Sequence, residues 1–322
     1  MPVTRDDVVQ AYRLILGRAP ESEAVVQGHV RDHADLDALR RVFLGSDELH
    51  EQLARPAEGS AEPPRLPLDA PPLQVETATD PATLARLIGE TARFWEAIGE
   101  TAPHFSVLTA PEFAPDRIAE NEARFFASAE YDRNLLLATL ARAGRSPEDF
   151  TRLVEFGSGV GRMTAYFAPL FREVIGLDIS RPHLQLAEAT MVRHGIRNAR
   201  FVQVTAADLH PVESYDLWFS RIVLQHNPPP VIAHILDRMF AGLAPDGLAI
   251  FQVPTYQVGY RFAVAEYLRS DLGARMEMHV IPQQAVLELA WRRGCRLVEM
   301  REDSAVSASP DWLSNTFVFR KG

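Results

Sequence analysis

The stretch Leu153-Val154-Glu155-Phe156-Gly157-Ser158-Gly159-Val160-Gly161-Arg162 decides the fold. Its apolar start predicts a buried parallel strand. Three glycines at alternate positions then predict a tight turn that a ligand can approach closely. Residues 163–170 have helical character. A strand, a glycine turn and a helix N-terminus together form the nucleotide end of a doubly wound α/β sheet.

The loop differs from two common nucleotide-binding motifs. A dinucleotide fingerprint requires glycine or alanine at its sixth position, which here is Arg162. A phosphate-cradling loop would need Gly-Lys-Ser/Thr, and none follows. The pattern acidic-x-Gly-x-Gly-x-Gly instead resembles the first motif of class I S-adenosylmethionine-dependent methyltransferases. A glycine turn that binds no ligand is the plain alternative.

This resemblance implies that the loop packs against the methionine part and ribose of S-adenosyl-L-methionine, whose product is S-adenosyl-L-homocysteine. Glu155 would orient the methionine amino group, and an acidic residue inside an apolar strand is costly unless it is paired. The implied loop contacts are Phe156, Gly157, Ser158, Gly159, Gly161 and Arg162.

Composition narrows the class of protein. The 322 residues suggest about two domains, and the net charge of −10 argues against a nucleic-acid partner. Lys321 is the only lysine, which makes a lysine base improbable and indicates a GC-rich bacterial source. The single cysteine, Cys295, excludes an internal disulfide, and no metal site is predicted. With neither a signal peptide nor an apolar run of membrane length, we expect a cytoplasmic protein.

Strands and helices alternate regularly after the glycine loop. Strands are expected at 174–178, 201–204, 216–223, 248–253, 297–300 and 316–319, and the intervening helices at 182–194, 228–243 and 282–293. Such alternation predicts a parallel sheet covered on both faces. Residues 150–322 therefore read as a doubly wound, mostly parallel, seven-stranded Rossmann-like sheet that binds S-adenosylmethionine.

The N-terminal third has a different organisation. Residues 1–55 read as a small helical domain, 56–79 as a proline-rich linker and 80–149 as lid helices. The segments Tyr12–Pro20 and Phe43–Leu49 resemble a helical module of unassigned function found beside bacterial glycan-modifying enzymes. That resemblance implies that residues 1–55 have a binding role or dock to a protein partner, rather than carry out chemistry. Within the lid, His104 and Tyr131 are candidates for contacting an acceptor.

Carboxylates follow two predicted strands. Asp178 ends the second strand, where open α/β sheets bind ligands, and can accept both ribose hydroxyls. Asp178 alone does not distinguish a dinucleotide from S-adenosylmethionine, and a solvated helix cap is the structural alternative. By resemblance, Asp208 accepts from the adenine amino group. The neighbouring implied cofactor contacts are Ile179, Ala207 and Leu209.

The segment Ser220–Pro228 follows the fourth strand, where the resembled family places the transferred methyl group. It lacks the Asn/Asp-Pro-Pro-Tyr signature of base methylation and resembles the Gln-His-x-Pro pattern of small-molecule and glycan enzymes. His226 is the candidate general base, with His279 in reserve; the alternative, which the sequence slightly favours, is a histidine that caps or packs against the helix at Pro228. Further candidate contacts are Ser220 and Val223 for the cofactor, and Gln225, Tyr256, Tyr260 and Arg261 for the acceptor.

The predicted function is methyl transfer from S-adenosylmethionine, favouring O-methylation of a sugar, a glycan or another small polar acceptor in polysaccharide biosynthesis. Two alternatives stay open. One is an NAD-dependent oxidoreductase, against which Arg162 counts. The other is a non-catalytic cofactor-binding scaffold that docks glycan-assembly proteins through residues 1–55.

Overall fold

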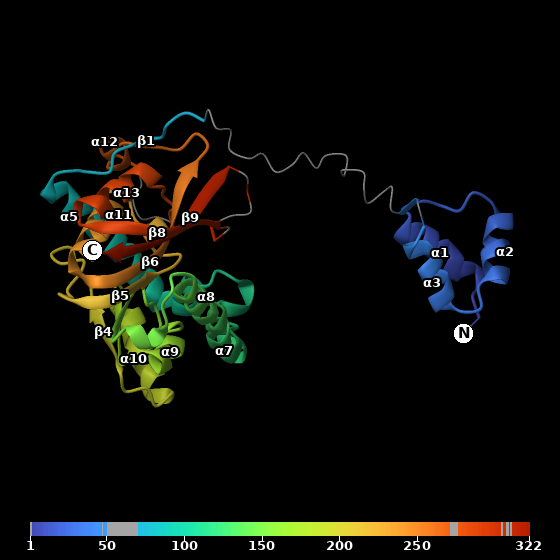
Figure 1. Ribbon diagram of the computed structural model, residues 1–322, viewed down its shortest axis with the longest axis horizontal. Coiled ribbons are helices and arrows are strands. Elements are labelled where there is room, and N and C mark those ends of the chain that lie inside the picture. The colour runs from blue at the N-terminus through green and yellow to red at the C-terminus, as the bar shows by residue number, and fades with distance from the viewer. Residues whose placement is uncertain are drawn as a thin grey trace. The chain divides into compact units, whose positions relative to one another are not determined.

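The structure is a computed structural model that describes residues 2–46, 48–49, 70–270, 276–303, 305–306, 309 and 311–322. The chain divides into two compact units, residues 1–68 and residues 69–322 (Figure 1). The greater part of the predicted linker, residues 56–69, lies outside the described residues.

The described part of the first unit contains three amphipathic helices, α1 (Arg5–Ile15), α2 (Glu23–Asp32) and α3 (Leu36–Leu44). Thr4 and Asp7 form the predicted capping box at the start of α1. The helices bury an apolar core on their facing sides, as the sequence periodicity predicts. Its buried members are Val3, Val8, Tyr12, Leu16, Val26, Leu39 and Phe43.

The second unit contains a seven-stranded sheet in the order β4-β3-β2-β5-β6-β9-β8. Its strands are β2 (Arg152–Phe156), β3 (Glu173–Asp178), β4 (Ala199–Gln203), β5 (Tyr215–Ser220), β6 (Leu243–Gln257), β8 (Cys295–Asp303) and β9 (Trp312–Lys321). The first five in this order pair in parallel, and β9 is antiparallel to both β6 and β8. The predicted mostly parallel sheet is confirmed.

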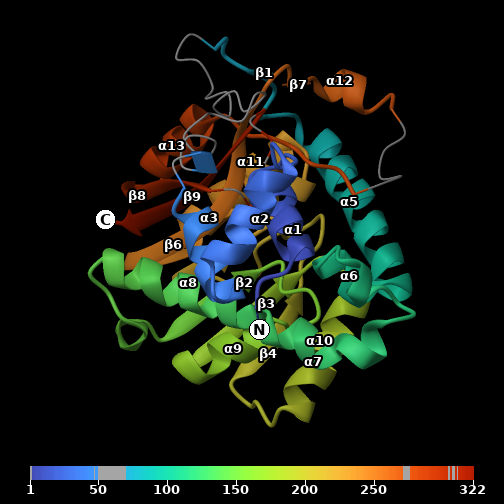
Figure 2. The same cartoon turned by 90° about the vertical axis from the view of Figure 1, so that its right-hand side faces the viewer.

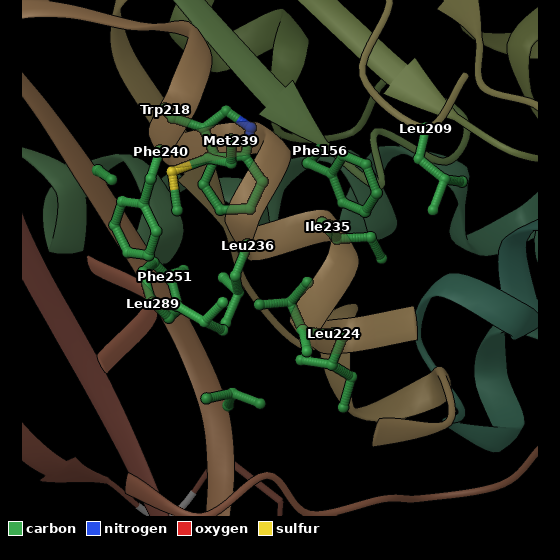
Figure 3. Close-up of a cluster of buried hydrophobic side chains, with 14 of the residues drawn as sticks. Phe156, Leu209, Trp218, Leu224, Ile235, Leu236, Met239, Phe240, Phe251 and Leu289 are labelled. Carbon is green, nitrogen blue, oxygen red and sulfur yellow. The ribbon is translucent and has the colours of Figure 1, made fainter. Parts of the chain in front are cut away.

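Helices cover both faces of this sheet (Figures 1 and 2). They are α9 (Thr164–Phe167), α10 (Arg181–Arg193), α11 (Pro229–Gly242) and α13 (Gln283–Arg292), with 3-10 turns at Ala168–Leu170 and Leu224–His226. Alternate strand residues serve opposite faces: Val154 packs with α11 and α13, whereas Leu153 packs against α9 and the helix at 129–142. Figure 3 shows side chains of α11, among them Leu236 and Phe240, against strand residues Trp218 and Phe251.

Within the second unit, four helices precede the first strand of the seven-stranded sheet. They are α5 (Pro81–Thr101), α6 (Pro103–Val107), α7 (Ile118–Ala127) and α8 (Ala129–Arg142), with 3-10 turns at Pro111–Phe113 and Pro147–Asp149. Asp80 caps α5 by accepting from the backbone of Ala82 and Thr83, both at 3.0 Å. Helix α8 packs against the face opposite α5.

The described end of the predicted linker folds onto the second unit. There β1 (Gln74–Val75) pairs in parallel with β7 (Arg261–Phe262), just before α12 (Val264–Tyr267). Residues 70–79 thus belong to the α/β unit rather than lying free of it. Proline content alone does not show where such a spacer ends, because a two-residue strand has almost no periodic signal.

None of the helices in the described part of the chain combines the length and apolar character that a bilayer crossing requires.

Candidate active site

A cavity of about 340 Å³ opens at the carboxyl ends of β2, β3 and β5, within the range of small-molecule sites. Helices α5, α6 and α8 also contribute lining residues. Predicted site residues that line it are Tyr131, Phe156, Gly157, Ser158, Gly159, Arg162, Asp178, Ile179, Leu209, Val223 and His226. Other lining residues are Thr91, Trp95, Ser106, Val107, Leu108, Ser128, Asp132, Met163, His183, Val204, Arg221, Ile222, Asn227 and Ile235.

The glycine loop forms the floor of this cavity. Gly157 and Gly159 have φ angles of +77° and +52°, in the left-handed region that favours glycine. A Cβ atom at Gly157 would collide with Val223, and one at Gly159 would lie 2.8 Å from Val107. The loop therefore needs glycine both for its backbone conformation and for the close approach of its neighbours.

Asp178 is held rigidly at the end of β3. Its Oδ2 accepts from the Gly159 backbone N–H at 2.8 Å, and its Oδ1 accepts from the Ser180 backbone N–H at 2.9 Å. A carboxylate oxygen has two lone pairs, so each can accept one more hydrogen bond from a ligand. The side chain is partly exposed to the cavity.

Glu155 lies beneath the loop and is completely buried. Its Oε2 accepts from the Thr164 hydroxyl at 2.6 Å. Among the residues that the structure describes, its Oε1 has no hydrogen-bond partner. Burial raises the pKa of this carboxyl to about 8. Glu155 does not line the cavity directly, so any effect on a ligand would act through the loop.

Two arginines share one buried carboxylate at the cavity wall. Arg162 and Arg221 each place an Nη atom 2.8 Å from a different oxygen of Asp132 on α8. Arg221 also lies over the ring of Tyr131, 5.3 Å from its centre. Nε of Arg162 is buried without a hydrogen-bond partner among the described residues. The cluster has one positive charge in excess, which suits an anionic ligand group.

The backbone is strained where Arg221 leaves β5. Ile222 has φ +57°, a conformation that β-branched residues rarely adopt. The buried Gln252 side chain holds it by accepting from the Ile222 N–H at 2.9 Å. This turn lies between Arg221 and Val223, both of which line the cavity. Strain of this kind concentrates at functional sites.

His226 presents one ring nitrogen for proton transfer. Its Nδ1 lies 2.8 Å from the carbonyl oxygen of Glu277. Because a carbonyl only accepts, Nδ1 carries the proton and Nε2 keeps its lone pair in the neutral ring. The Gln225 side-chain nitrogen lies 3.5 Å from this Nε2, a long contact. The Trp95 ring packs at 5.5 Å, and burial lowers the pKa of His226. The ring is therefore neutral near pH 7, with Nε2 as a proton acceptor.

His183 of α10 joins helix α6 to the segment that follows β3. Its ring lies 2.6 Å from the Ser180 hydroxyl through Nδ1 and 2.8 Å from the Ser106 hydroxyl of α6 through Nε2. Nε2 is also 3.2 Å from the Pro103 carbonyl, so this nitrogen donates. The contacts bring Val107 of α6 over Gly159 and cover the glycine loop.

Several predicted site residues lie outside the cavity lining. Ser220 donates to the Phe156 carbonyl, Asp208 accepts from the backbone of His210, and the His104 ring packs on Phe125. The others are Glu155, Gly161, Ala207, Gln225, Tyr256, Tyr260, Arg261 and His279.

His279 has both ring nitrogens engaged. Tyr260 donates to its Nδ1 at 3.0 Å, and Nε2 donates to Glu277 at 3.1 Å. In this arrangement His279 supports the segment that contacts His226.

Sequence reasoning missed Trp95, Asp132, His183 and Arg221. Arg221 had an available signal, because it directly follows a strand that ends at the site. Asp132 and Trp95 are on helices that reach the cavity only through tertiary packing.

Residues 153–247 match the methyltransferase domain family. Over 113 residues the chain is 37% identical to trans-aconitate 2-methyltransferase of Methylobacterium radiotolerans, covering 34% of this chain and 41% of that protein. Over 178 residues it is 26% identical to ubiquinone biosynthesis O-methyltransferase of Rhodopseudomonas palustris, which covers 54% of this chain and 62% of that protein. The chain thus spans less than two thirds of the length of either relative.

The chain also superposes on the N-methyltransferase NodS of Bradyrhizobium japonicum in complex with S-adenosyl-L-homocysteine, with a TM-score of 0.48 and 16% identity over 72% of this chain and 98% of that one. The matched residues 153–247 include the glycine loop, Asp178 and His226. Residues 153–247 are therefore a methyltransferase domain.

Proposed function

We propose that this protein transfers a methyl group from S-adenosylmethionine to a hydroxyl of a small polar acceptor, with a sugar or glycan as the favoured class. One observation carries the proposal. The glycine loop, the anchored carboxylate of Asp178 and the ring of His226 line the same cavity. The methyltransferase domain match supports the reaction class.

The cavity has groups that fit S-adenosylmethionine. Asp178 retains lone pairs for two ribose hydroxyls, and Gly157 and Gly159 line the cavity without a side chain of their own. The cluster of Arg162, Arg221 and Asp132 has a net charge of one positive unit, which suits the methionine carboxylate. The buried Nε of Arg162, unpartnered among the described residues, is a donor that such a group would satisfy.

When bound, S-adenosylmethionine supplies an electrophilic methyl group on a positively charged sulfur. The protein then has to align the acceptor and exclude water, and alignment can contribute about 7–11 kcal/mol. Trp95 of α5 and Val107 of α6 line the cavity together with the strand ends. The hydrogen bond between His183 and Ser106 holds α6 in place.

His226 is the proposed general base. Its Nε2 takes the proton of the acceptor hydroxyl as the oxygen becomes a nucleophile, and the Glu277 carbonyl stabilises the resulting imidazolium through Nδ1–H. Burial keeps the ring neutral before reaction by lowering the pKa of His226. Of the two predicted candidates, only His226 lines the cavity, whereas His279 contacts Tyr260 and Glu277 outside it.

The acceptor class rests on the resemblance of the N-terminal segments to modules found beside glycan-modifying enzymes, a warrant by association. The relatives named above differ in their acceptors, so their similarity supports methyl transfer more than any one acceptor. The first unit is then the proposed docking site for a protein partner. Arg162, engaged with Asp132 at the position where a dinucleotide fold needs a small residue, disfavours the oxidoreductase alternative.

Methyl-labelled S-adenosylmethionine tests the acceptor class. The protein is incubated with separate panels of monosaccharides, sugar nucleotides and small carboxylic acids that include trans-aconitate. We expect label in a sugar hydroxyl. Label only in a carboxylic acid would contradict the sugar assignment while preserving methyl transfer. Tight S-adenosylhomocysteine binding without turnover on any panel would favour the non-catalytic scaffold.

A further inference from the structure

The segment that holds His226 is itself held by a chain of contacts outside the cavity. We propose that residues 74–76, 260–267 and 277–279, here called the outer clamp, position His226 as the base by keeping the Glu277 carbonyl on Nδ1. This inference rests on the proposed role of His226. It assigns a task to Glu76 and Tyr267, which do not line the cavity.

The inner end of the clamp is a two-way backbone contact. Glu277 O lies 2.8 Å from His226 Nδ1, while the His279 backbone N–H donates to Gln225 O at 2.7 Å. Residues 277–279 thus run beside residues 225–226, with one hydrogen bond at each end of the three-residue segment. A displacement of Glu277 would remove the only acceptor that Nδ1 has among the described residues.

Tyr267 and His279 hold the Glu277 side chain. The Tyr267 hydroxyl donates to Glu277 Oε2 at 2.5 Å, and His279 Nε2 lies 3.1 Å from the same oxygen. The rings of Tyr267 and Phe262 each pack edge-on against His279 with centres 5.6 Å apart. Since Glu277 is held by its side chain, its carbonyl is oriented as well.

The outer end of the clamp is the strand that follows the linker. Glu76 Oε2 accepts from the Val264 backbone N–H at 2.6 Å, which caps α12, and Glu76 N–H donates to Phe262 O at 3.0 Å. Tyr267 is the last residue of α12. The contacts therefore run from Glu76 through α12 to Tyr267, Glu277 and His226.

The chemical consequence is the choice of tautomer. A neutral histidine can protonate either ring nitrogen, and only the form with its proton on Nδ1 offers Nε2 as a base. Without the Glu277 carbonyl, part of the population would move the proton to Nε2 and become inactive. One neutral hydrogen bond corresponds to about a 2- to 10-fold change in the ratio of the two forms.

The test is the ¹⁵N spectrum of the full chain with labelled histidine rings at about pH 8, above the ordinary histidine pKa of ~6.5. The His226 signals are assigned by their loss in His226→Gln. We expect a protonated Nδ1 and an unprotonated Nε2 in the wild type. In Tyr267→Phe and in Glu76→Ala, the ratio should shift toward Nε2–H by about 2- to 10-fold.

Tyr215→Phe is the matched control, because it removes a buried tyrosine hydroxyl that donates to the Met239 carbonyl away from the cavity. It should leave the His226 ratio unchanged. Unaltered ratios in both clamp variants, or an equal shift in the control, would overturn the proposal, as would Nε2–H in the wild type. Glu76 is exposed, so its variant remains informative should Tyr267→Phe not fold. Calorimetry with S-adenosylhomocysteine on the same samples tests the proposed function separately.

Discussion

Asp178 Oδ2 accepts a hydrogen bond from the Gly159 backbone N–H over 2.8 Å, which joins the carboxylate at the end of β3 to the loop after β2. The two parts of the site that the sequence marks separately are therefore one rigid unit. A ligand held by Asp178 is placed against the glycine loop without further adjustment of either. This relationship makes Asp178 the most informative position for testing cofactor binding.

Replacing Asp178 by alanine should weaken S-adenosylhomocysteine binding by about 2–4 kcal/mol, the loss of two charge-assisted hydrogen bonds to the ribose. Calorimetry measures the change. Asp216 offers a matched control, because its carboxylate also accepts two backbone N–H bonds, from Thr151 and Arg152 at 2.8 Å, but does not line the cavity. Asp216→Ala should leave the affinity within about threefold. An Asp178→Ala protein that binds as well as the control would rule out the ribose contact.

His226→Ala should lower turnover at least about 100-fold, because a positioned base typically contributes 10²–10⁴-fold. Affinity for S-adenosylhomocysteine should stay nearly unchanged. His210→Ala is the control: His210 is buried, bonded to the Val212 carbonyl at 3.2 Å and absent from the cavity lining. It should reduce thermal stability while turnover persists. Near-normal turnover in a folded His226→Ala protein would exclude its catalytic role.

Glu155 should make the ligand-free protein less stable as pH rises. Its folded-state pKa is raised from 4.5 to about 8, so between these values the folded protein retains a proton that the unfolded chain loses. The stabilising effect is complete below pH 4.5 and disappears toward pH 8. Relative to Glu155→Gln, the wild type should lose several kcal/mol of unfolding free energy across that interval, because each tenfold difference in proton affinity corresponds to about 1.36 kcal/mol.

Urea unfolding of the wild type and Glu155→Gln at a series of pH values measures this difference. The comparison cancels the contributions of the buried histidines, because they are the same in both proteins. Parallel curves for the two proteins would mean that Glu155 is ionised in the folded state and paired in some way that its surroundings do not show.

Removing residues 1–68 should leave S-adenosylhomocysteine affinity unchanged, because residues 69–322 form a compact unit by themselves. Removing residues 1–79 should cost stability in addition, because it also deletes β1 and the contact of Glu76 with Val264. Thermal unfolding and calorimetry on both truncated proteins distinguish the cases. Loss of binding in the shorter truncation would show that the first unit contributes to the site.

Local sequence was sufficient for the parts of the site built on strand ends. The strand at 153–156, the glycine turn and Asp178 follow from apolar runs, glycine spacing and the rule that parallel strands deliver ligands to their carboxyl ends. The sheet predicted over residues 150–322 is confirmed, and the methyltransferase domain family matches residues 153–247 of that range. Each of these signals is contained within about ten consecutive residues.

The cover of the cavity could not be predicted in the same way. Trp95 and Asp132 are on α5 and α8, and their polar and aromatic side chains fit an ordinary amphipathic helix equally well. Only tertiary packing brings Asp132 between Arg162 and Arg221, 30 and 89 residues further along the chain. The positive φ of Ile222 likewise depends on Gln252, because a β-branched residue gives no local signal for that conformation.

The measurement that tests the central claim most directly is calorimetry of the full chain with S-adenosylhomocysteine and NAD in parallel. We predict saturable S-adenosylhomocysteine binding with at least micromolar affinity, about −8.2 kcal/mol, and no detectable heat with NAD. Saturable NAD binding that excludes S-adenosylhomocysteine would contradict this assignment and identify the cavity as a dinucleotide-binding site.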